Sequence, residues 1–278
     1  MWYYKYNNGI TEAAEERKRC AVVGLAVCIG IILIACSVPA YRYSGRVAVN
    51  NESVWKVLAI YFLITILAAA ATRYFQQELR GIHGAKELIA LLKFTASLPT
   101  VLFALKGYLI RPTRFGRYVC LAIGVGMIAD MAININPAIG GVVFLVGHLL
   151  YDVAFLSEKK PSGRQAALWI VMSALMIIPV YVFRSHIGSP VYCLGVWLYV
   201  MILISTVVFS WPLDKMVFAA ALIFAFSDCF MIANIYGHGS MVMKILALEV
   251  YYGALLLYGT VLWRKNYEHE ADTGALAV

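Results

Sequence analysis

Four carboxyl or imidazole side chains lie deep inside apolar stretches of the sequence and have the residue types needed for acid–base chemistry. Asp130, His148 and Asp152 occur in the run Cys120–Phe155, and Asp228 occurs in a second run that ends at Ile235. A charge at bilayer depth costs about 2.5 kcal/mol or more on insertion scales, so such residues are rare and mark functional sites by default. Two carboxyl groups in a medium of low dielectric have pKa values that are pushed apart, which leaves one as an acid and the other ionised. The sequence therefore predicts an acidic site between helices.

The predicted helix that contains His148 carries a stripe of larger side chains along one face. Spacings of four, three and four residues place these side chains in line, namely Phe144, His148, Tyr151 and Phe155. Such a stripe is expected in a binding site, and it is also expected in a packing seam that holds a hydrogen-bonded histidine. For the two aspartates, the alternative interpretation is an ion pair or hydrogen bond that stabilises the bundle.

The polar side chains are expected at similar depth in the membrane. Asp130 and Asp228 lie equally far from the starts of two predicted helices that run in the same direction, and each residue adds about 1.5 Å. Lys93, His148 and Tyr251 lie on predicted helices that run the other way and reach the same half of the membrane. We therefore expect these side chains to converge on one site. For Lys93, snorkelling of the ammonium group to the interface is an alternative.

The composition indicates an integral membrane protein. Of the 278 residues, 62% are hydrophobic and 14% are charged, whereas about half of a soluble domain is apolar and about a quarter is charged. The net charge is +8, and the Lys and Arg residues cluster at the ends of apolar runs, where they face lipid headgroups. The sequence therefore predicts an all-α, polytopic transmembrane helical bundle, with membrane lipids and no nucleic acid as its partners.

Nine apolar stretches are predicted to form helices, since about 20 apolar residues span the hydrocarbon core. Eight form the core and one additional helix precedes them. The expected ranges are Cys20–Ala40, Trp55–Thr72, Leu88–Leu109, a fourth helix that ends near Asn136, a fifth that ends near Leu156, Ala166–Phe183, Val191–Ser210, Lys215–Ile235 and Met241–Trp263. Three regions result: residues 1–54 with a polar N-terminus and the additional helix, residues 55–263 with the membrane domain, and a polar tail over residues 264–278.

Several short motifs, in the same order along the chain, resemble those of the YhhN-type lysoplasmalogenases. The resemblance covers about residues 55–263. The motifs are Lys93 in an early helix, Asp130 in GMIADMAI, the stretch FLVGHLLY that is similar to F-x-x-x-H-x-x-Y and contains Phe144, His148 and Tyr151, Phe226-Ser227-Asp228, and Tyr251-Tyr252. The sequence differs from the family pattern in having Phe94 in place of a proline, Ala129 in place of a glycine and Leu255 near the place of a glutamine.

The resemblance implies a hydrolase that cleaves the vinyl-ether bond of lysoplasmalogens. The products are a fatty aldehyde and glycerophosphoethanolamine or glycerophosphocholine. A lysophospholipid substrate is implied, and no metal or organic cofactor. The expected location is the endoplasmic reticulum or another endomembrane, and homodimerisation stays open.

Vinyl-ether hydrolysis suits the residues found. It requires protonation of the outer alkene carbon, which a carboxylic acid can supply, and attack of water on the resulting oxocarbenium ion, which a carboxylate can stabilise. Asp130 and Asp228 are the candidates for these two roles in either order, and His148 is expected to orient a carboxylate or relay a proton. The substrate-binding residues are predicted to be Lys93 and Tyr151 at the phosphate, together with Phe144, Ser227 and Tyr251.

Two other classes of function use the same features. A proton-coupled transporter also needs paired aspartates and a histidine at membrane depth, although internal repeats and broken helices are more typical of it. A scaffold that has kept the fold and lost turnover is the other alternative, and the differences at Ala129 and Leu255 leave it open.

Overall fold

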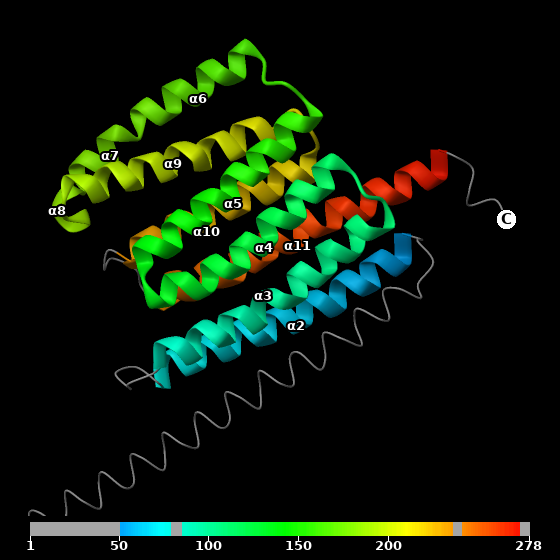
Figure 1. Cartoon of the computed structure of the whole chain (residues 1–278), viewed down its shortest axis with the longest axis horizontal. Coiled ribbons are helices and arrows are strands. Elements are labelled where there is room, and N and C mark those ends of the chain that lie inside the picture. The colour runs from blue at the N-terminus through cyan, green and yellow to red at the C-terminus, as the bar shows by residue number, and fades with distance from the viewer. Residues whose placement is uncertain (1–50, 79–84, 236–240, 273–278) are drawn as a thin grey trace, which may run out of the picture.

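In a computed structural model of the chain, the structure describes residues 51–78, 85–235 and 241–272, and the regular structure in these ranges is helical (Figure 1). The predicted helix Cys20–Ala40 lies outside the described residues. The helices are α2 (Asn51–Glu78), α3 (Ala85–Ile110), α4 (Arg114–Ile135), α5 (Pro137–Glu158), α6 (Gly163–Leu175), α7 (Ile177–Val182), α8 (Arg184–Ile187), α9 (Pro190–Ser210), α10 (Lys215–Ile235) and α11 (Met241–Asp272).

Local signals in the sequence explain where several helices begin. Asn136 accepts hydrogen bonds from the backbone N–H groups of Ala138 and Ile139, and Pro137 occupies the first turn of α5, where its missing N–H costs nothing. Thr113 caps α4 through the N–H of Gly116. Ser162 forms a capping box with Gln165 at the start of α6, and a capping box satisfies two otherwise unpaired N–H donors.

The predicted helix Ala166–Phe183 is divided in the structure. Helix α6 ends at Leu175, and α7 begins at Ile177 and contains Pro179. A proline lacks the N–H that would bond to the carbonyl four residues earlier, and its ring clashes with that carbonyl. The carbonyl concerned is that of Leu175, which is where α6 ends.

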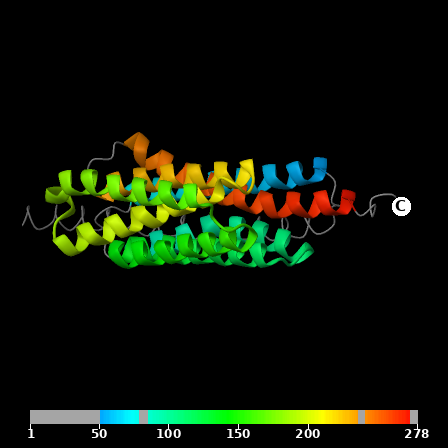
Figure 2. The same ribbon diagram turned by 90° about the horizontal axis from the view of Figure 1, so that it is seen from above.

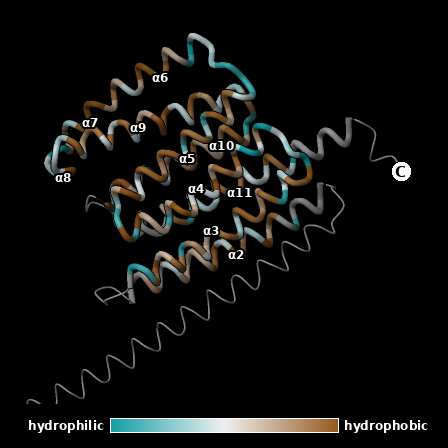
Figure 3. The backbone as a smooth tube through the Cα atoms, in the orientation of Figure 1, coloured by the Kyte–Doolittle hydropathy of each residue, from teal (hydrophilic) through white to brown (hydrophobic). Residues whose placement is uncertain are grey.

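Six helices in the described ranges are long and apolar enough to cross a membrane: Lys86–Ile110, Arg114–Ile135, Pro137–Glu158, Gly163–Val182, Pro190–Ser210 and Lys215–Ile232. A shorter apolar stretch, Leu58–Thr72, lies within α2. Hydrophobic residues follow the lengths of these helices, and hydrophilic residues concentrate at the turns between them (Figure 3). The chain is therefore a multi-pass, all-α membrane protein, as the composition predicts.

The helices pack in two layers (Figure 2). Helices α3, α4 and α5 form one layer, and α2, α11 and α10 form the other. Helix α9 packs against α5 and α10, and α6 packs against the outer side of α9. The main hydrophobic core lies between the layers, so a side chain that points inward from α4, α5, α10 or α11 reaches the same interior.

Helix α11 continues to Asp272, beyond the end predicted at Trp263. Its residue Arg264 forms an ion pair with Asp214, which precedes α10. Partial burial raises the pKa of Asp214, but hydrogen bonds from Arg264 and from the backbone N–H groups of Met216 and Val217 outweigh this effect and lower the pKa below its usual value. This ion pair fixes one end of α10 to α11.

Candidate active site

Asp228 is the centre of a hydrogen-bonded network between three helices. It lies on α10 and is 1% exposed. Its Oδ2 atom lies 2.6 Å from the hydroxyl of Tyr199 on α9 and 2.9 Å from Nε2 of His148 on α5. The structure thus brings two of the predicted catalytic residues into direct contact.

His148 is enclosed by aromatic rings and has one nitrogen without a partner. Its ring centroid lies 4.7 Å from that of Phe224 and 5.8 Å from that of Tyr199, and its side chain is 1% exposed. When the Nε2–H group donates a hydrogen bond to the Asp228 carboxylate, the imidazole is neutral and Nδ1 carries a bare lone pair. The Nδ1 atom has no hydrogen-bond partner in the structure. It is therefore available to accept a proton from a reacting group.

Asp130 belongs to a second network, between α4 and α3. It is 3% exposed, and its Oδ2 atom accepts a hydrogen bond of 2.5 Å from the hydroxyl of Ser97. Lys93 lies one helical turn before Ser97, and its half-buried ammonium group interacts favourably with the Asp130 carboxylate. The two predicted acids therefore do not hydrogen-bond to each other in the structure, although their charges interact electrostatically.

Tyr251 on α11 lies between the two networks. Its hydroxyl would lie 3.0 Å from a Cβ atom on Gly126, one turn before Asp130 on α4. Its ring packs edge-on against Phe224 and Phe144, with centroid distances of 5.3 Å and 5.8 Å. The hydroxyl interacts with the Asp130 carboxyl but has no hydrogen bond of good geometry. Tyr251 thus joins the Asp130 side of the core to the rings around His148.

The remaining predicted site residues are buried in the same core, with different surroundings. Tyr151 stacks on Tyr258 with a centroid distance of 4.3 Å, and its hydroxyl has no partner. Phe144 is buried against Tyr251. The Ser227 hydroxyl donates to the backbone carbonyl of Ala247 at 2.7 Å, which ties α10 to α11. A substrate-binding role for these residues stays a prediction.

The comparisons with known proteins identify the family of the chain. The model of the YhhN family matches residues 88–260, a range that runs from α3 into α11 and contains every predicted site residue. The chain belongs to the YhhN family. This family includes lysoplasmalogenases and consists generally of lysoplasmalogenase-like hydrolases. Searches of curated proteins and of solved structures gave no match.

Three positions at which this YhhN chain departs from the expected motifs lie close to the site. Ala129 and Leu255 are both buried in the main hydrophobic core. Phe94 follows Lys93 and is half-buried on α3. Apolar side chains therefore occupy these three positions. The hydrogen bonds of Asp130, His148 and Asp228 form without the glycine and the glutamine of the family pattern.

Sequence reasoning gave no role in the site to several polar residues of this YhhN core. Tyr199 and Ser97, which bind the two aspartates, belong to no recognised motif. Asp152 on α5 is 7% exposed and accepts a hydrogen bond from Ser205 on α9. A usable signal existed for two of them, since Ser97 follows Lys93 by four residues and Asp152 follows His148 by four, and this spacing places side chains on one helix face.

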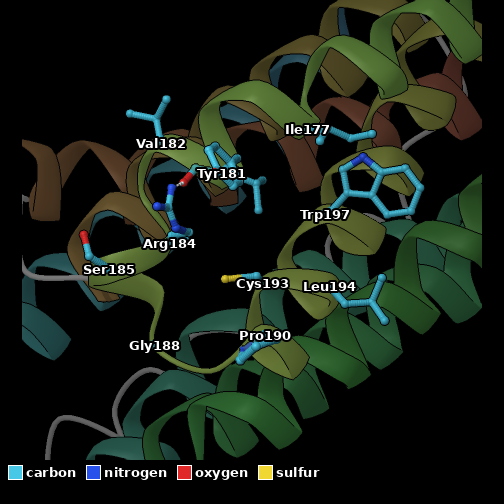
Figure 4. A pocket seen from close by; sticks show the side chains of 11 residues that line it. Ile177, Tyr181, Val182, Arg184, Ser185, Gly188, Pro190, Cys193, Leu194 and Trp197 are labelled. Atoms are coloured by element: carbon cyan, nitrogen blue, oxygen red, sulfur yellow. Dashed lines mark hydrogen bonds between the residues drawn. The ribbon is translucent and has the colours of Figure 1, made fainter.

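An open pocket of about 720 Å³ lies away from this core, between α7, α8 and the start of α9 (Figure 4). Its wall includes Tyr181, Arg184 and Trp197. The guanidinium of Arg184 lies 4.0 Å from the centroid of the Tyr181 ring, and Nη1 donates to the Tyr181 carbonyl. Trp197 and Tyr199 are two residues apart on α9, so the pocket and the Asp228 network lie on different sides of this helix.

Across residues 51–78, 85–235 and 241–272, no three His, Cys, Asp or Glu side chains are grouped so that they could hold a metal ion.

Proposed function

We propose that this YhhN protein is a lysoplasmalogenase, a hydrolase that cleaves the vinyl-ether bond of lysoplasmalogens. The products are a fatty aldehyde and glycerophosphoethanolamine or glycerophosphocholine. The observation that carries the proposal is the separation of the two buried carboxyl groups into different networks. Asp228 is paired with a histidine, and Asp130 is paired with a hydroxyl. This difference in surroundings is what an acid and a base need in order to coexist.

The two networks supply complementary steps. Asp130 gives a proton to the outer alkene carbon, and an oxocarbenium ion forms at the inner carbon. Water then attacks this carbon and loses a proton to Nδ1 of His148, while Asp228 stabilises the imidazolium through Nε2. The product of these steps is a hemiacetal. A charge pair of this kind in a low-dielectric site stabilises developing charge more strongly than it would in water.

Collapse of the hemiacetal restores both residues. The imidazolium of His148 returns its proton to the glycerol oxygen as the carbon–oxygen bond breaks. The hemiacetal hydroxyl loses its proton to the Asp130 carboxylate as the aldehyde forms. The net reaction consumes one water molecule and needs no further reagent. The same two residues exchange acid and base roles between the two halves of the reaction, as required for a cycle that regenerates the enzyme.

Binding of the substrate is assigned to groups beside Asp130. The half-buried Lys93 ammonium pairs with the phosphate of the lysophospholipid, since an ammonium group binds phosphate as a point charge. The rings of Phe144 and Tyr251 pack edge-on against each other, and the vinyl ether is assigned a position beside them, between the two networks. The endoplasmic reticulum or another endomembrane remains the expected location.

The test is release of fatty aldehyde from lysoplasmenylethanolamine and lysoplasmenylcholine by the purified protein in detergent. Wild type and Asp214→Asn, which alters an aspartate at the end of α10, are expected to release aldehyde. Asp130→Asn and Asp228→Asn are expected to release none. Folding of each variant is checked by size-exclusion chromatography and thermal unfolding. If the folded wild-type protein releases no aldehyde from either substrate, the proposal is refuted. Proton flux into liposomes that contain the protein would then favour the transporter.

A further inference from the structure

A third carboxyl group, that of Asp152, lies in the core and has no role in the reaction described above. It is placed one helical turn after His148 on α5, and residues at this spacing face the same side of a helix. The Oδ2 atom of Asp152 accepts a hydrogen bond from Ser205 on α9. The Oδ1 atom is buried and has no hydrogen bond of good geometry, although the Thr206 hydroxyl, which donates to the Ile202 carbonyl, also interacts with this carboxyl group. A buried carboxyl oxygen without a partner is costly, because its desolvation is not compensated.

Two more buried polar atoms near Asp152 also lack partners. These are the Nδ1 atom of His148 and the hydroxyl oxygen of Tyr258 on α11. The Tyr258 ring is fully buried and stacks on Tyr151. Its hydroxyl interacts electrostatically with both Asp152 and Asp228, and Asp152 interacts in the same way with His148. His148 and Asp152 face the same side of α5, and the Tyr258 ring stacks on Tyr151, which lies between them on that helix, so the three side chains surround the same part of α5.

This set of atoms has the composition of a hydration site. A buried water molecule typically makes about three hydrogen bonds to polar groups that have no other partner. The carboxylate oxygen of Asp152 and the lone pair on His148 accept hydrogen bonds, and the Tyr258 hydroxyl donates one or accepts one. One water molecule can donate to both acceptors and accept from the hydroxyl. Each of the three atoms is then satisfied.

We propose that Asp152, Tyr258 and Nδ1 of His148 form the site that holds the hydrolytic water. The proposal rests on the proposed function for its catalytic part. Asp152 and Tyr258 orient the water oxygen, and the water proton passes to Nδ1 of His148 as the oxygen bonds to the oxocarbenium carbon. The alternative is that the Asp152–Ser205 hydrogen bond only joins α5 to α9. These interpretations differ in whether water reaches Tyr258.

The presence of water is tested without reference to activity, by hydroxyl-radical footprinting of the full chain with mass spectrometry. Radicals generated from bound water oxidise the side chains beside it. Trp263 is the matched control, because it lies on the same helix as Tyr258, is 1% exposed and donates its Nε1–H to the Phe103 carbonyl at 3.0 Å. Oxidation of Tyr258 is expected in wild type and is expected to fall in Asp152→Leu, while Trp263 stays unmodified. If the oxidation rate of Tyr258 does not exceed that of Trp263, the proposed water site is wrong, whether or not the protein releases aldehyde.

The catalytic part is tested with Tyr258→Phe and Asp152→Asn. The first variant removes one hydroxyl and keeps the stack on Tyr151. The second keeps an acceptor for Ser205 and removes the charge. Both are expected to lower kcat about tenfold with an unchanged KM, a smaller loss than the roughly 10²–10⁴-fold supplied by a direct acid or base. An unchanged kcat in either folded variant overturns the assignment to hydrolytic water. If the wild-type protein releases no aldehyde but its Tyr258 is oxidised, the hydrolase function is refuted and the water site is retained.

Discussion

The Nε2 atom of His148 lies 2.9 Å from the Oδ2 atom of Asp228, and this contact joins α5 to α10 inside the apolar bundle. It fixes the ring so that the opposite nitrogen, Nδ1, is left without a partner. A carboxylate that orients an imidazole and stabilises its protonated form is a recurrent arrangement in hydrolases. In this chain the arrangement is built from residues on two helices that are far apart in the sequence.

Asp228→Asn is expected to abolish most of the activity. The amide cannot stabilise the imidazolium, and its NH₂ group favours the wrong tautomer of His148. We expect kcat for aldehyde release to fall by roughly 10²–10⁴-fold with little change in KM. Asp214→Asn should keep the wild-type rate, since Asp214 lies at the end of α10 and pairs with Arg264. A folded Asp228→Asn variant that retains a tenth of the wild-type kcat would contradict the assigned role.

Tyr199→Phe removes the second hydrogen bond to Asp228 and should lower kcat without removing a reacting group. The hydroxyl lies 2.6 Å from Oδ2, and a hydrogen bond to a charged group contributes about 1.5–3 kcal/mol. A loss of about tenfold or more in kcat is expected. Tyr192→Phe is the control on the same helix, because Tyr192 is exposed. Equal rates for the two variants would show that Tyr199 has no part in orienting the site.

The main candidate residues could be predicted from the sequence because so few charges lie inside its apolar runs. Asp130, His148, Asp152 and Asp228 stand out on that ground alone, and the structure places all four in the buried core. The partners of these residues could not be predicted. Tyr199 is one of 18 tyrosines, and nothing in its local sequence shows which side of α9 faces Asp228.

The helices themselves were largely predictable, and their packing was not. Caps such as Asn136 and the break at Pro179 follow from local backbone chemistry. Helices α9 and α10 are apolar on all sides, as helices in lipid are, so hydrophobic periodicity does not identify the buried face. The pairing of α5 with α9 depends on contacts such as Asp152 with Ser205, which only the folded chain brings together.

Ser97→Ala is expected to impair the acid step less severely than Asp130→Asn. The serine hydroxyl donates to Oδ2 of Asp130 and also contacts the Lys93 carbonyl at 3.0 Å. Its loss removes one hydrogen bond and leaves the carboxyl in place, so a fall in kcat of about tenfold is expected, against roughly 10²–10⁴-fold for Asp130→Asn. Steady-state kinetics of both variants provide the measurement. The reverse order would exclude Asp130 as the proton donor.

The Asp214–Arg264 ion pair should stabilise the protein in a pH-dependent way. The pKa of Asp214 is lowered in the folded state, so its stabilisation is present above the unfolded pKa of about 3.9 and is lost as the pH falls through the lower, folded pKa. A partly exposed pair contributes about 1 kcal/mol or less. The unfolding temperature of Asp214→Asn should lie below that of wild type at about pH 7 and converge with it as the pH falls below the folded pKa of Asp214. A gap that persists at acid pH would contradict this linkage.

Gly140→Ala is expected to destabilise the contact between α4 and α5, and Gly141→Ala is not. A Cβ atom at Gly140 would lie 2.4 Å from the Cα atom of Ile133, whereas nothing lies within 4 Å of one at Gly141. Because the obstacle at Gly140 is backbone, the helices must move apart, at a cost of about 1–3 kcal/mol or more. Alanine at Gly141 should instead favour the helix by about 0.5–1 kcal/mol. Thermal unfolding in one detergent compares the two variants directly. If they unfold at the same temperature, the close approach of α5 to Ile133 is wrong.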